Sequence, residues 1–370
     1  MELFVCSSAY QLLNAINIVN TYRIEADLIL IRKEMETICD VDVLLKSNFF
    51  RKIYKWYDLA EKLSDQTNSS VEYFLDKLKK AHIYVNKKNI YKSLPNGKAK
   101  YDVINIAYAD YPSQCIYYYF KLKGAKLAFF EDGTYTYNCL AVRISITRRV
   151  ISKLLFGSFI NDDVKKVYVR IPSKLNQGKR NKISVEPINS CKCDNKEILF
   201  SIFKGKKKDI DILNKRIVFF DQNIEYAEVK EKMIRLANDI NIKYGKNNIV
   251  VKLHPASRNI NDYSEQVNMV SSRLPFELIM EELPMNNKVL VSIFSTACFS
   301  PKFIMDEEPY IIFTYKALGF DKVGWFNDEY TRLIRELKDT YSDPKRVLVP
   351  KTYDDVIIFL DKIMKKECMI

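Results

Sequence analysis

This sequence has little of several residue types, and each shortage excludes a class of protein. It holds two histidines, His82 and His254, and its eight cysteines are scattered over 370 residues. Two histidines are too few for a typical zinc site, and only Cys191 and Cys193 lie close together. Glycine and proline number 9 and 11, which argues against collagen-like or linker-dominated chains. We therefore expect reduced thiols in a cytosolic protein and no bound metal.

Long apolar runs are missing as well. The apolar segment 289–299 contains two serines and a threonine, and it falls short of the roughly 18 apolar residues of a membrane-spanning helix. The opening residues 1–6 lack the basic and long apolar regions of a secretory signal. We expect a cytoplasmic location, with a peripheral contact at the inner face of the cell membrane left open.

Positive charge, in contrast, is in excess. Lysine and arginine number 59 against 46 acidic residues, a formal net charge of +13, while 48% of the residues are hydrophobic. This composition supports a packed core and indicates an anionic partner, namely nucleic acid, a membrane surface or a phosphate-bearing substrate. A lysine-rich surface that reflects biased composition explains the charge equally well. Because the sequence has no zinc finger, RNA-recognition motif or basic tail, a nucleic-acid-binding protein is kept only as the non-enzyme alternative.

Short apolar runs alternate with longer periodic segments, which is typical of parallel sheets covered by helices. In the first half we expect strands at Leu3–Cys6, Ala26–Ile31, Val103–Ala107, Lys126–Phe130 and Lys166–Ile171, and helices over Tyr10–Val19 and Ser113–Leu122. In the second half we expect strands at Arg216–Phe220, Asn248–Leu253, Val289–Phe294, Tyr310–Phe313 and Arg346–Val349, and helices over Glu225–Tyr244, within Ser264–Leu283, and over Asp328–Tyr341 and Tyr353–Lys366.

A basic, less apolar stretch at 173–195 and a polar run at 204–209 separate the two halves. We place the domain boundary there, with domains 1–205 and 206–370, and expect a loop. Two Rossmann-like α/β domains that face across a cleft account for the alternation. Ligands of such sheets bind outside the carboxyl ends of the strands.

The first strand end with chemical potential is Glu131-Asp132-Gly133, directly after the strand 126–130. Paired carboxylates raise one another's pKa and supply a candidate general base. The glycine permits a sharp turn or a close approach to a ligand. The alternative is an ordinary acidic turn after a strand.

Two further strand ends lie in the second half. His254 and Pro255 follow the strand 248–253, where a histidine can donate a hydrogen bond or a proton to a phosphate. Ser295 and Thr296 follow the strand 289–294 and can open a helix whose N-terminus binds an anion. The alternatives are a partly buried histidine and plain N-capping. The spacing from His254 to Ser295 allows two adjacent strand-helix units of one sheet.

In their order, these three motifs resemble those of bacterial sialyltransferases. The opening Leu3-Phe4-Val5-Cys6-Ser7 and the run Phe130 to Thr134 look most like glycosyltransferase family 52, which contains lipooligosaccharide and capsule sialyltransferases. The polysialyltransferase families share the motifs. The resemblance implies a GT-B fold and an inverting, metal-independent transfer of sialic acid from CMP-sialic acid to a hydroxyl of a terminal sugar, with galactose expected, on a bacterial surface glycan.

The resemblance also implies roles for residues. Asp132 would be the general base, supported by Glu131, and His254 would contact the CMP phosphate and act as general acid. The N-terminal domain would hold the acceptor and the base, and the C-terminal domain would bind the donor. Further donor-side residues would be Gly133, Pro255, Ser295 and Thr296, and by position Gln222 and Asn223; Ser7, Ser8 and Gln11 would line the acceptor side.

Several alternatives remain. The donor can be another CMP-linked nonulosonic acid, CMP-Kdo or a nucleoside-diphosphate hexose, and the enzyme can be a polysialyltransferase. Two D-x-D pairs have the spacing of metal-dependent transferases, Asp40 with Asp42 in a helical or loop stretch and Asp209 with Asp211 in a charged linker. We assign neither a metal. The basic amphipathic segment 143–156 fits an anionic membrane face or an ordinary packed helix, and a homodimer stays open.

Overall fold

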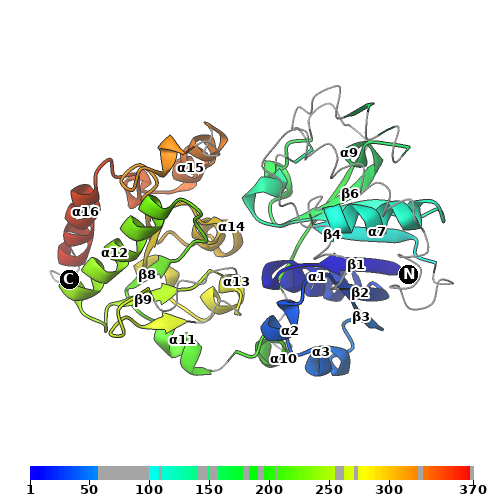
Figure 1. Cartoon of the computed structure of the whole chain (residues 1–370), viewed down its shortest axis with the longest axis horizontal. Helices are drawn as coiled ribbons and strands as arrows, with labels where there is room; N and C mark the ends of the chain where they lie inside the picture. The colour runs from blue at the N-terminus through cyan, green and yellow to red at the C-terminus, as the bar shows by residue number, and fades with distance from the viewer. Residues whose placement is uncertain are drawn as a thin grey trace. The chain divides into compact units, whose positions relative to one another are not determined.

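The computed structural model describes residues 1–56, 100–107, 111–137, 139–140, 149–150, 153, 157–177, 183–190, 196–205, 207–254, 262–270, 274–323 and 328–366. The chain divides into two compact units, Met1–Lys204 and Gly205–Ile370 (Figure 1). Each unit is built around one parallel sheet. None of the described helices is long and apolar enough to cross a membrane.

The first unit contains a sheet of seven described strands in the order β3-β2-β1-β4-β5-β6-β7. These are β1 (Glu2–Cys6), β2 (Ala26–Leu30), β3 (Ile53–Lys55), β4 (Val103–Ala107), β5 (Lys126–Phe130), β6 (Val164–Val169) and β7 (Ser184–Pro187). Its helices are α1 (Ala9–Tyr22), α2 (Met35–Ile38), α3 (Val41–Lys46), α7 (Tyr111–Lys121), α9 (Ile160–Asp163) and α10 (Lys196–Ile202), with 3-10 turns η1 (Thr134–Tyr137) and η2 (Pro172–Lys174).

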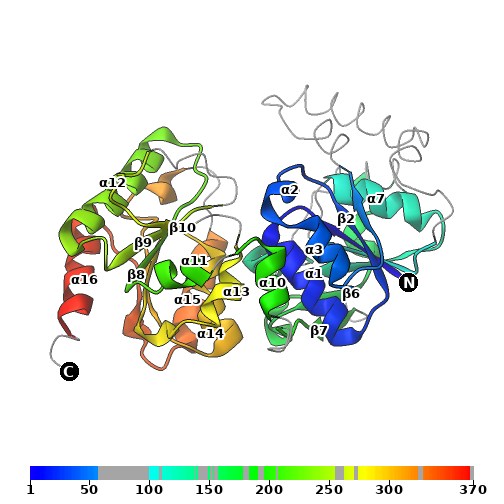
Figure 2. The same cartoon turned by 90° about the horizontal axis from the view of Figure 1, so that it is seen from below.

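In the second unit the described residues form a sheet of six strands in the order β10-β9-β8-β11-β12-β13. These are β8 (Ile217–Phe220), β9 (Ile249–Lys252), β10 (Met269–Val270), β11 (Val289–Ser292), β12 (Tyr310–Phe313) and β13 (Val347–Leu348). Its helices are α11 (Lys207–Leu213), α12 (Ala227–Tyr244), α13 (Phe276–Met280), α14 (Ser300–Met305), α15 (Asp328–Thr340) and α16 (Tyr353–Lys366). Both views place α12 and α16 on one side of this sheet and α13 and α14 on the other (Figure 1, Figure 2).

The predicted class is confirmed, because all strand pairs in both sheets are parallel. The apolar runs form central strands that are buried on both faces, as every residue of β8, β9 and β11 shows. In both units the first strand lies between the second and the fourth, the strand order of a Rossmann fold. The switch points are therefore β1/β4 and β8/β11, where such sheets bind ligands.

Several elements differ from the sequence-based expectation. The basic stretch 173–195 contributes β7, which pairs in parallel with β6 at the sheet edge, where polar residues are tolerated because one side is solvated. Asp209 and Asp211 lie on α11 and not in a linker. The strands that carry His254 and Ser295 are not adjacent, because β8 lies between β9 and β11.

Five cysteines lie in the described part of the chain, and none of these five is in a disulfide. Cys6, Cys39, Cys115, Cys139 and Cys298 are buried thiols. Residues 191, 193 and 368 lie outside the described part of the chain.

Candidate active site

The acidic motif of the first unit divides into one buried and one exposed carboxylate. Glu131 follows β5 and is only 5% exposed, whereas Asp132 is exposed. The Glu131 Oε1 accepts a hydrogen bond from the Tyr10 hydroxyl at 2.6 Å. Its Oε2 accepts from the Tyr137 hydroxyl at 2.6 Å and from the Arg170 backbone N–H at 2.8 Å.

These contacts make Glu131 an anchor for the end of the strand. Burial and the Glu131 carboxylate raise the pKa of Tyr137 well above its ordinary value, so its hydroxyl keeps the proton that it donates. The Glu131 carbonyl accepts from the Asn14 side chain at 3.0 Å, and Asn14 Oδ1 accepts from the Arg170 guanidinium at 2.9 Å. The sequence motif predicted Glu131 as a supporting residue, but nothing in the pattern marked Tyr10, Tyr137 or Arg170.

Asp132 is exposed just beyond the carboxyl end of β5. Its backbone N–H donates to Thr136 Oγ1 at 2.8 Å, and the next residue, Gly133, has a φ of 83°. That backbone region favours glycine, so the turn that follows Asp132 depends on this residue. The pKa of the Cys6 thiol is raised well above its ordinary value, mainly by burial and to a lesser extent by the Asp132 carboxylate. Asp132 is thus close to the end of β1, at the switch point of this sheet.

The serines after β1 form the cap of α1. Ser8 Oγ accepts from the Gln11 backbone N–H at 3.2 Å. Gln11 Oε1 in turn accepts from the backbone N–H and the hydroxyl of Ser7, at 2.7 and 3.0 Å. Ser8 is thus the N-cap of α1. The expected contact of Ser7, Ser8 and Gln11 with an acceptor stays a prediction.

In the second unit, three neighbouring strands end at one level. The register pairs Phe220 at the end of β8 with Lys252 of β9 and with Ser292 of β11. His254, Gln222 and Phe294 each lie two residues beyond these strand ends. The carboxyl edge of the sheet therefore gathers the predicted histidine, the amide and the segment before Ser295, in agreement with the expected position of a ligand site.

His254 is partly buried next to a carboxylate that the sequence reading overlooked. Its backbone N–H donates to Asp221 Oδ2 at 3.2 Å. Burial lowers the pKa of His254 below its ordinary value, Asp221 opposes this shift and Lys252 adds to it. A signal for Asp221 was available, because it directly follows the apolar strand β8 just as Asp132 closely follows β5. Pro255 lies outside the described residues.

Gln222 connects two strand ends. Its Nε2 donates to the Phe294 carbonyl at 2.6 Å, and its Oε1 accepts from the Phe294 N–H at 2.8 Å. Ser295 caps the 3-10 turn η6 (Thr296–Cys298), with its hydroxyl accepting from the Ala297 N–H at 3.3 Å. Thr296 and Asn223 are exposed at the same edge. The predicted cap is present, but it opens a three-residue turn, so little helix dipole stands behind it.

Both D-x-D pairs are associated with helices, one at the start of α3 and the other within α11. Asp40 caps α3 by accepting from the backbone N–H groups of Asp42 and Val43 at 3.1 Å. Among the described residues, no three His, Cys, Asp or Glu side chains are grouped so that they could hold a metal ion. In the basic amphipathic segment, Arg149 forms an ion pair with Asp162 at 2.9 Å, whereas residues 143 and 148 are not described.

Comparison with known proteins adds a family and a fold. The model of the family described as alpha-2,8-polysialyltransferase (POLYST) matches residues 2–307. Among curated protein sequences, none matches this chain. The structure of Arabidopsis thaliana UGT89C1 complexed with UDP-L-rhamnose is 8% identical, covers 94% of this chain and 92% of its own, and superposes with a TM-score of 0.51.

Two other solved structures are similar at a lower level. UDP-GlcNAc 2-epimerase from Neisseria meningitidis bound to UDP-GlcNAc is 13% identical, with 99% and 100% of the two chains covered and a TM-score of 0.46. CalG4, the calicheamicin glycosyltransferase, is 10% identical, with 90% and 83% covered and a TM-score of 0.48. At such low identity a structural likeness speaks for the fold alone. The two parallel sheets in tandem, together with the likeness at a TM-score of 0.51, identify the fold as GT-B.

Proposed function

Because this chain belongs to the alpha-2,8-polysialyltransferase family, we propose that it transfers sialic acid from CMP-sialic acid to a hydroxyl of a glycan that already ends in sialic acid. The observation that carries this proposal is the family match over residues 2–307, which spans all three strand-end motifs. Family membership makes the chain a glycosyltransferase of the sialyltransferase type. It favours a polysialyltransferase over the galactose-directed, family 52 enzyme that the sequence suggested.

In this proposal the exposed Asp132 acts as general base. Its carboxylate takes the proton from the acceptor hydroxyl while the acceptor oxygen bonds to the anomeric carbon, and the bond from that carbon to the CMP phosphate oxygen breaks. Glu131 is excluded from proton transfer, because both of its oxygens accept hydrogen bonds in a buried site. A base must be within reach of the hydroxyl that it deprotonates, and Asp132 is the exposed member of the pair.

His254 and the Ser295-Thr296 segment would bind the phosphate of the donor. The leaving group carries a single phosphate, so one imidazole and two hydroxyls can stabilise its departure without a metal ion. The sialyl centre is expected to resemble an oxocarbenium ion in the transition state, by analogy with glycoside cleavage. His254 would donate a hydrogen bond or a proton to the departing phosphate. Gln222 holds the Ser295 segment through Phe294 and acts on the donor indirectly.

The net charge of +13 supports an anionic acceptor. A sialylated glycan carries one carboxylate per sialic acid unit, and its attraction to a basic protein weakens as salt screens the charges. We expect the KM for an oligosialic acid acceptor to rise between low and physiological salt, and the KM for a neutral acceptor to change little. Nucleic acid should not compete with the acceptor at physiological salt.

The direct test uses the purified full chain, CMP-sialic acid and two acceptors, an α2,8-linked oligosialic acid and a galactose-terminated oligosaccharide. CMP release and the mass of the product are measured. The proposal expects elongation of the oligosialic acid. Transfer to galactose alone would contradict the proposed acceptor, and absence of CMP release from all CMP-linked nonulosonic acids would contradict the reaction. CMP-Kdo and a nucleoside-diphosphate hexose serve as donor controls.

A further inference from the structure

A group of charged side chains is buried beneath the carboxyl ends of β8 and β9. Asp221, Lys252 and Glu277 are 3%, 6% and 9% exposed, and they come from the end of β8, from β9 and from α13. Burying a charge is unfavourable unless other charges or hydrogen bonds compensate it. A hydrophobic core would be simpler to pack, so this group indicates a role beyond stability.

Asp221 is the member that contacts the histidine segment. Its Oδ2 accepts from the backbone N–H of His254 at 3.2 Å, and its Oδ1 accepts from the Tyr263 hydroxyl at 2.7 Å. Its own backbone N–H donates to the Lys252 carbonyl at 3.0 Å. One residue thus fixes the backbone on both sides of Leu253. The end of β9 cannot shift without breaking a hydrogen bond to Asp221.

From this geometry we infer that Asp221 is a positioning residue, which holds the backbone of His254 in place at the carboxyl ends of the strands and fixes a carboxylate beside that residue. The inference deepens the proposed function and rests on it for the role of His254. Asp221 acts through the histidine and has no assigned contact with substrate. The Asp221 carboxylate is held in place, because its Oδ1 accepts from the Tyr263 hydroxyl while its Oδ2 accepts from the His254 N–H.

The charges around His254 come from several elements. The Asp221 carboxylate, directly after β8, favours the charged form of His254, and Lys252 of β9 disfavours it. Glu277 of α13 and Asp209 of α11 act in turn on Lys252. Burial lowers the pKa of Lys252 to about 8, and the three carboxylates oppose that shift. The charge of Lys252 disfavours a charged imidazole at His254. Asp221 is therefore the group whose removal should make His254 harder to protonate.

The two histidines of this chain make a direct measurement practical. In a His82→Gln background, the imidazole protons of His254 are the only histidine signals in an NMR pH titration of the full-length protein. Asp221→Asn keeps an oxygen that can accept the His254 N–H but removes the charge. We expect the His254 titration to move to lower pH by about one unit or more. An unchanged titration midpoint would overturn the inference.

A matched control is Asp239→Asn. Asp239 also accepts a tyrosine hydroxyl at 2.7 Å, that of Tyr353, but it lies on α12. This variant should leave the His254 titration where it is. A shift of the same size in both variants would show a general effect of charge and would contradict a specific role for Asp221.

Transfer assays then test the role in catalysis. A general acid loses activity as pH rises through its pKa, so Asp221→Asn should lower kcat at least about tenfold and move the alkaline limb of its pH profile to lower pH. Asp221→Glu keeps the charge but displaces it by one methylene; if Asp221→Asn does not fold, this variant should titrate nearly as the parent yet lose transfer. Full transfer by Asp221→Glu would overturn the positioning role. A shifted titration in a protein that transfers no sialic acid would contradict only the proposed function.

Discussion

Gln222 and Phe294 are joined by a pair of hydrogen bonds, in which the side-chain amide of one residue contacts both backbone groups of the other. The pair continues the pairing of β8 and β11 beyond their last registered residues, Phe220 and Ser292. It holds the segment that leads into Ser295 and Thr296. The amide side chain thus makes the two hydrogen bonds that the backbone of a further strand residue would make.

Loss of this pair should weaken donor binding. Gln222→Ala leaves two backbone groups of Phe294 without this partner, at a cost of about 1–3 kcal/mol. We expect kcat/KM for CMP-sialic acid to fall about tenfold or more, mainly through KM. Steady-state kinetics measure the change, with Gln266→Ala at an exposed position of the same unit as the control. An unchanged KM would show that the Ser295 segment does not need the tether.

The two adjacent carboxylates should separate catalysis from stability. Asp132→Asn removes the proposed base and should lower kcat by about 10²–10⁴-fold, with a melting temperature within a degree or so of the parent, as for other exposed sites. Glu131→Gln should instead destabilise the protein by about 1–3 kcal/mol, because the amide cannot accept all three hydrogen bonds. Each variant is the control for the other, because both change a carboxylate to an amide at adjacent positions. Calorimetry measures the stability of the two variants, and transfer assays measure their activity. Full activity of Asp132→Asn would refute its role as base.

Binding of CMP should couple to protonation of His254. Burial keeps the pKa of this imidazole below its ordinary value in the free protein, whereas a bound phosphate stabilises the charged form. We therefore expect CMP affinity to weaken as pH rises from 5.5 to 8. Calorimetric titration of the parent and of His254→Ala measures this, and their difference isolates the imidazole from the titration of CMP. Parallel pH profiles would exclude the contact.

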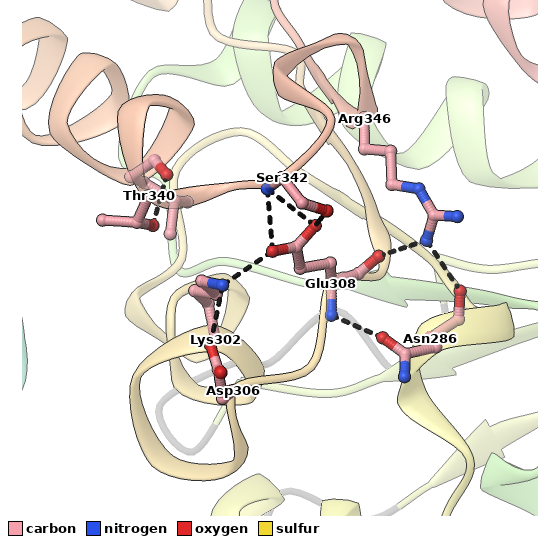
Figure 3. Close-up of polar contacts among 8 residues, drawn as sticks. Asn286, Lys302, Asp306, Glu308, Thr340, Ser342 and Arg346 are labelled. Carbon is pink, nitrogen blue, oxygen red and sulfur yellow. Dashed lines mark hydrogen bonds and ion pairs between the residues drawn. The ribbon is translucent and has the colours of Figure 1, made fainter.

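A second polar cluster lies at the amino end of β12, and it predicts that the stability of the protein falls in acid (Figure 3). Glu308 precedes β12 and accepts from Lys302 at 2.6 Å and from the Ser342 N–H at 2.9 Å. Burial opposes its ionisation, but the hydrogen bonds from Lys302 and Ser342 prevail and lower the pKa of Glu308 to about 2. Arg346 donates to the Glu308 carbonyl at 2.7 Å, which ties the start of β12 to the turn before β13.

The stability from this cluster should vanish in acid. Because the folded pKa of Glu308 lies below the unfolded value, its contribution is complete above about pH 4.5 and is lost as pH falls toward about 2. Glu308→Gln should lower the melting temperature by several degrees at pH 7, and the difference from the parent should shrink at pH 3. Glu336→Gln, which alters an exposed pair with Arg332, should have little effect. An equal loss at both pH values would contradict the linkage.

Much of the architecture was predictable, because apolar runs that are buried on both faces leave a strong signal. The predicted bounds of Val103–Ala107, Lys126–Phe130 and Tyr310–Phe313 agree with the structure residue for residue. Short or edge strands were missed for a physical reason. Ile53–Lys55 and Ser184–Pro187 lie at the two edges of their sheet, where an apolar run is not required.

The candidate site was predictable only in part. The motifs gave the residues at the strand ends, but they could not tell the buried carboxylate from the exposed one. That difference depends on Tyr10, Tyr137 and Arg170 from three other segments. The position of Asp221 directly after the apolar strand β8 was a local signal for the residue, but it does not reveal the partners of the carboxylate. Its partners His254 and Tyr263 are 33 and 42 residues away, and no local pattern encodes such contacts.

The positive φ of Gly133 means that the acidic motif combines two kinds of constraint. Asp132 is required only by the reaction that we propose, whereas Gly133 is required by the path of the backbone, whatever the chain does. A chain that kept this fold without the reaction would still need the glycine for its turn, but it would not need the aspartate. The residue at position 133 therefore reports on the turn, and the residue at position 132 reports on the proposed reaction.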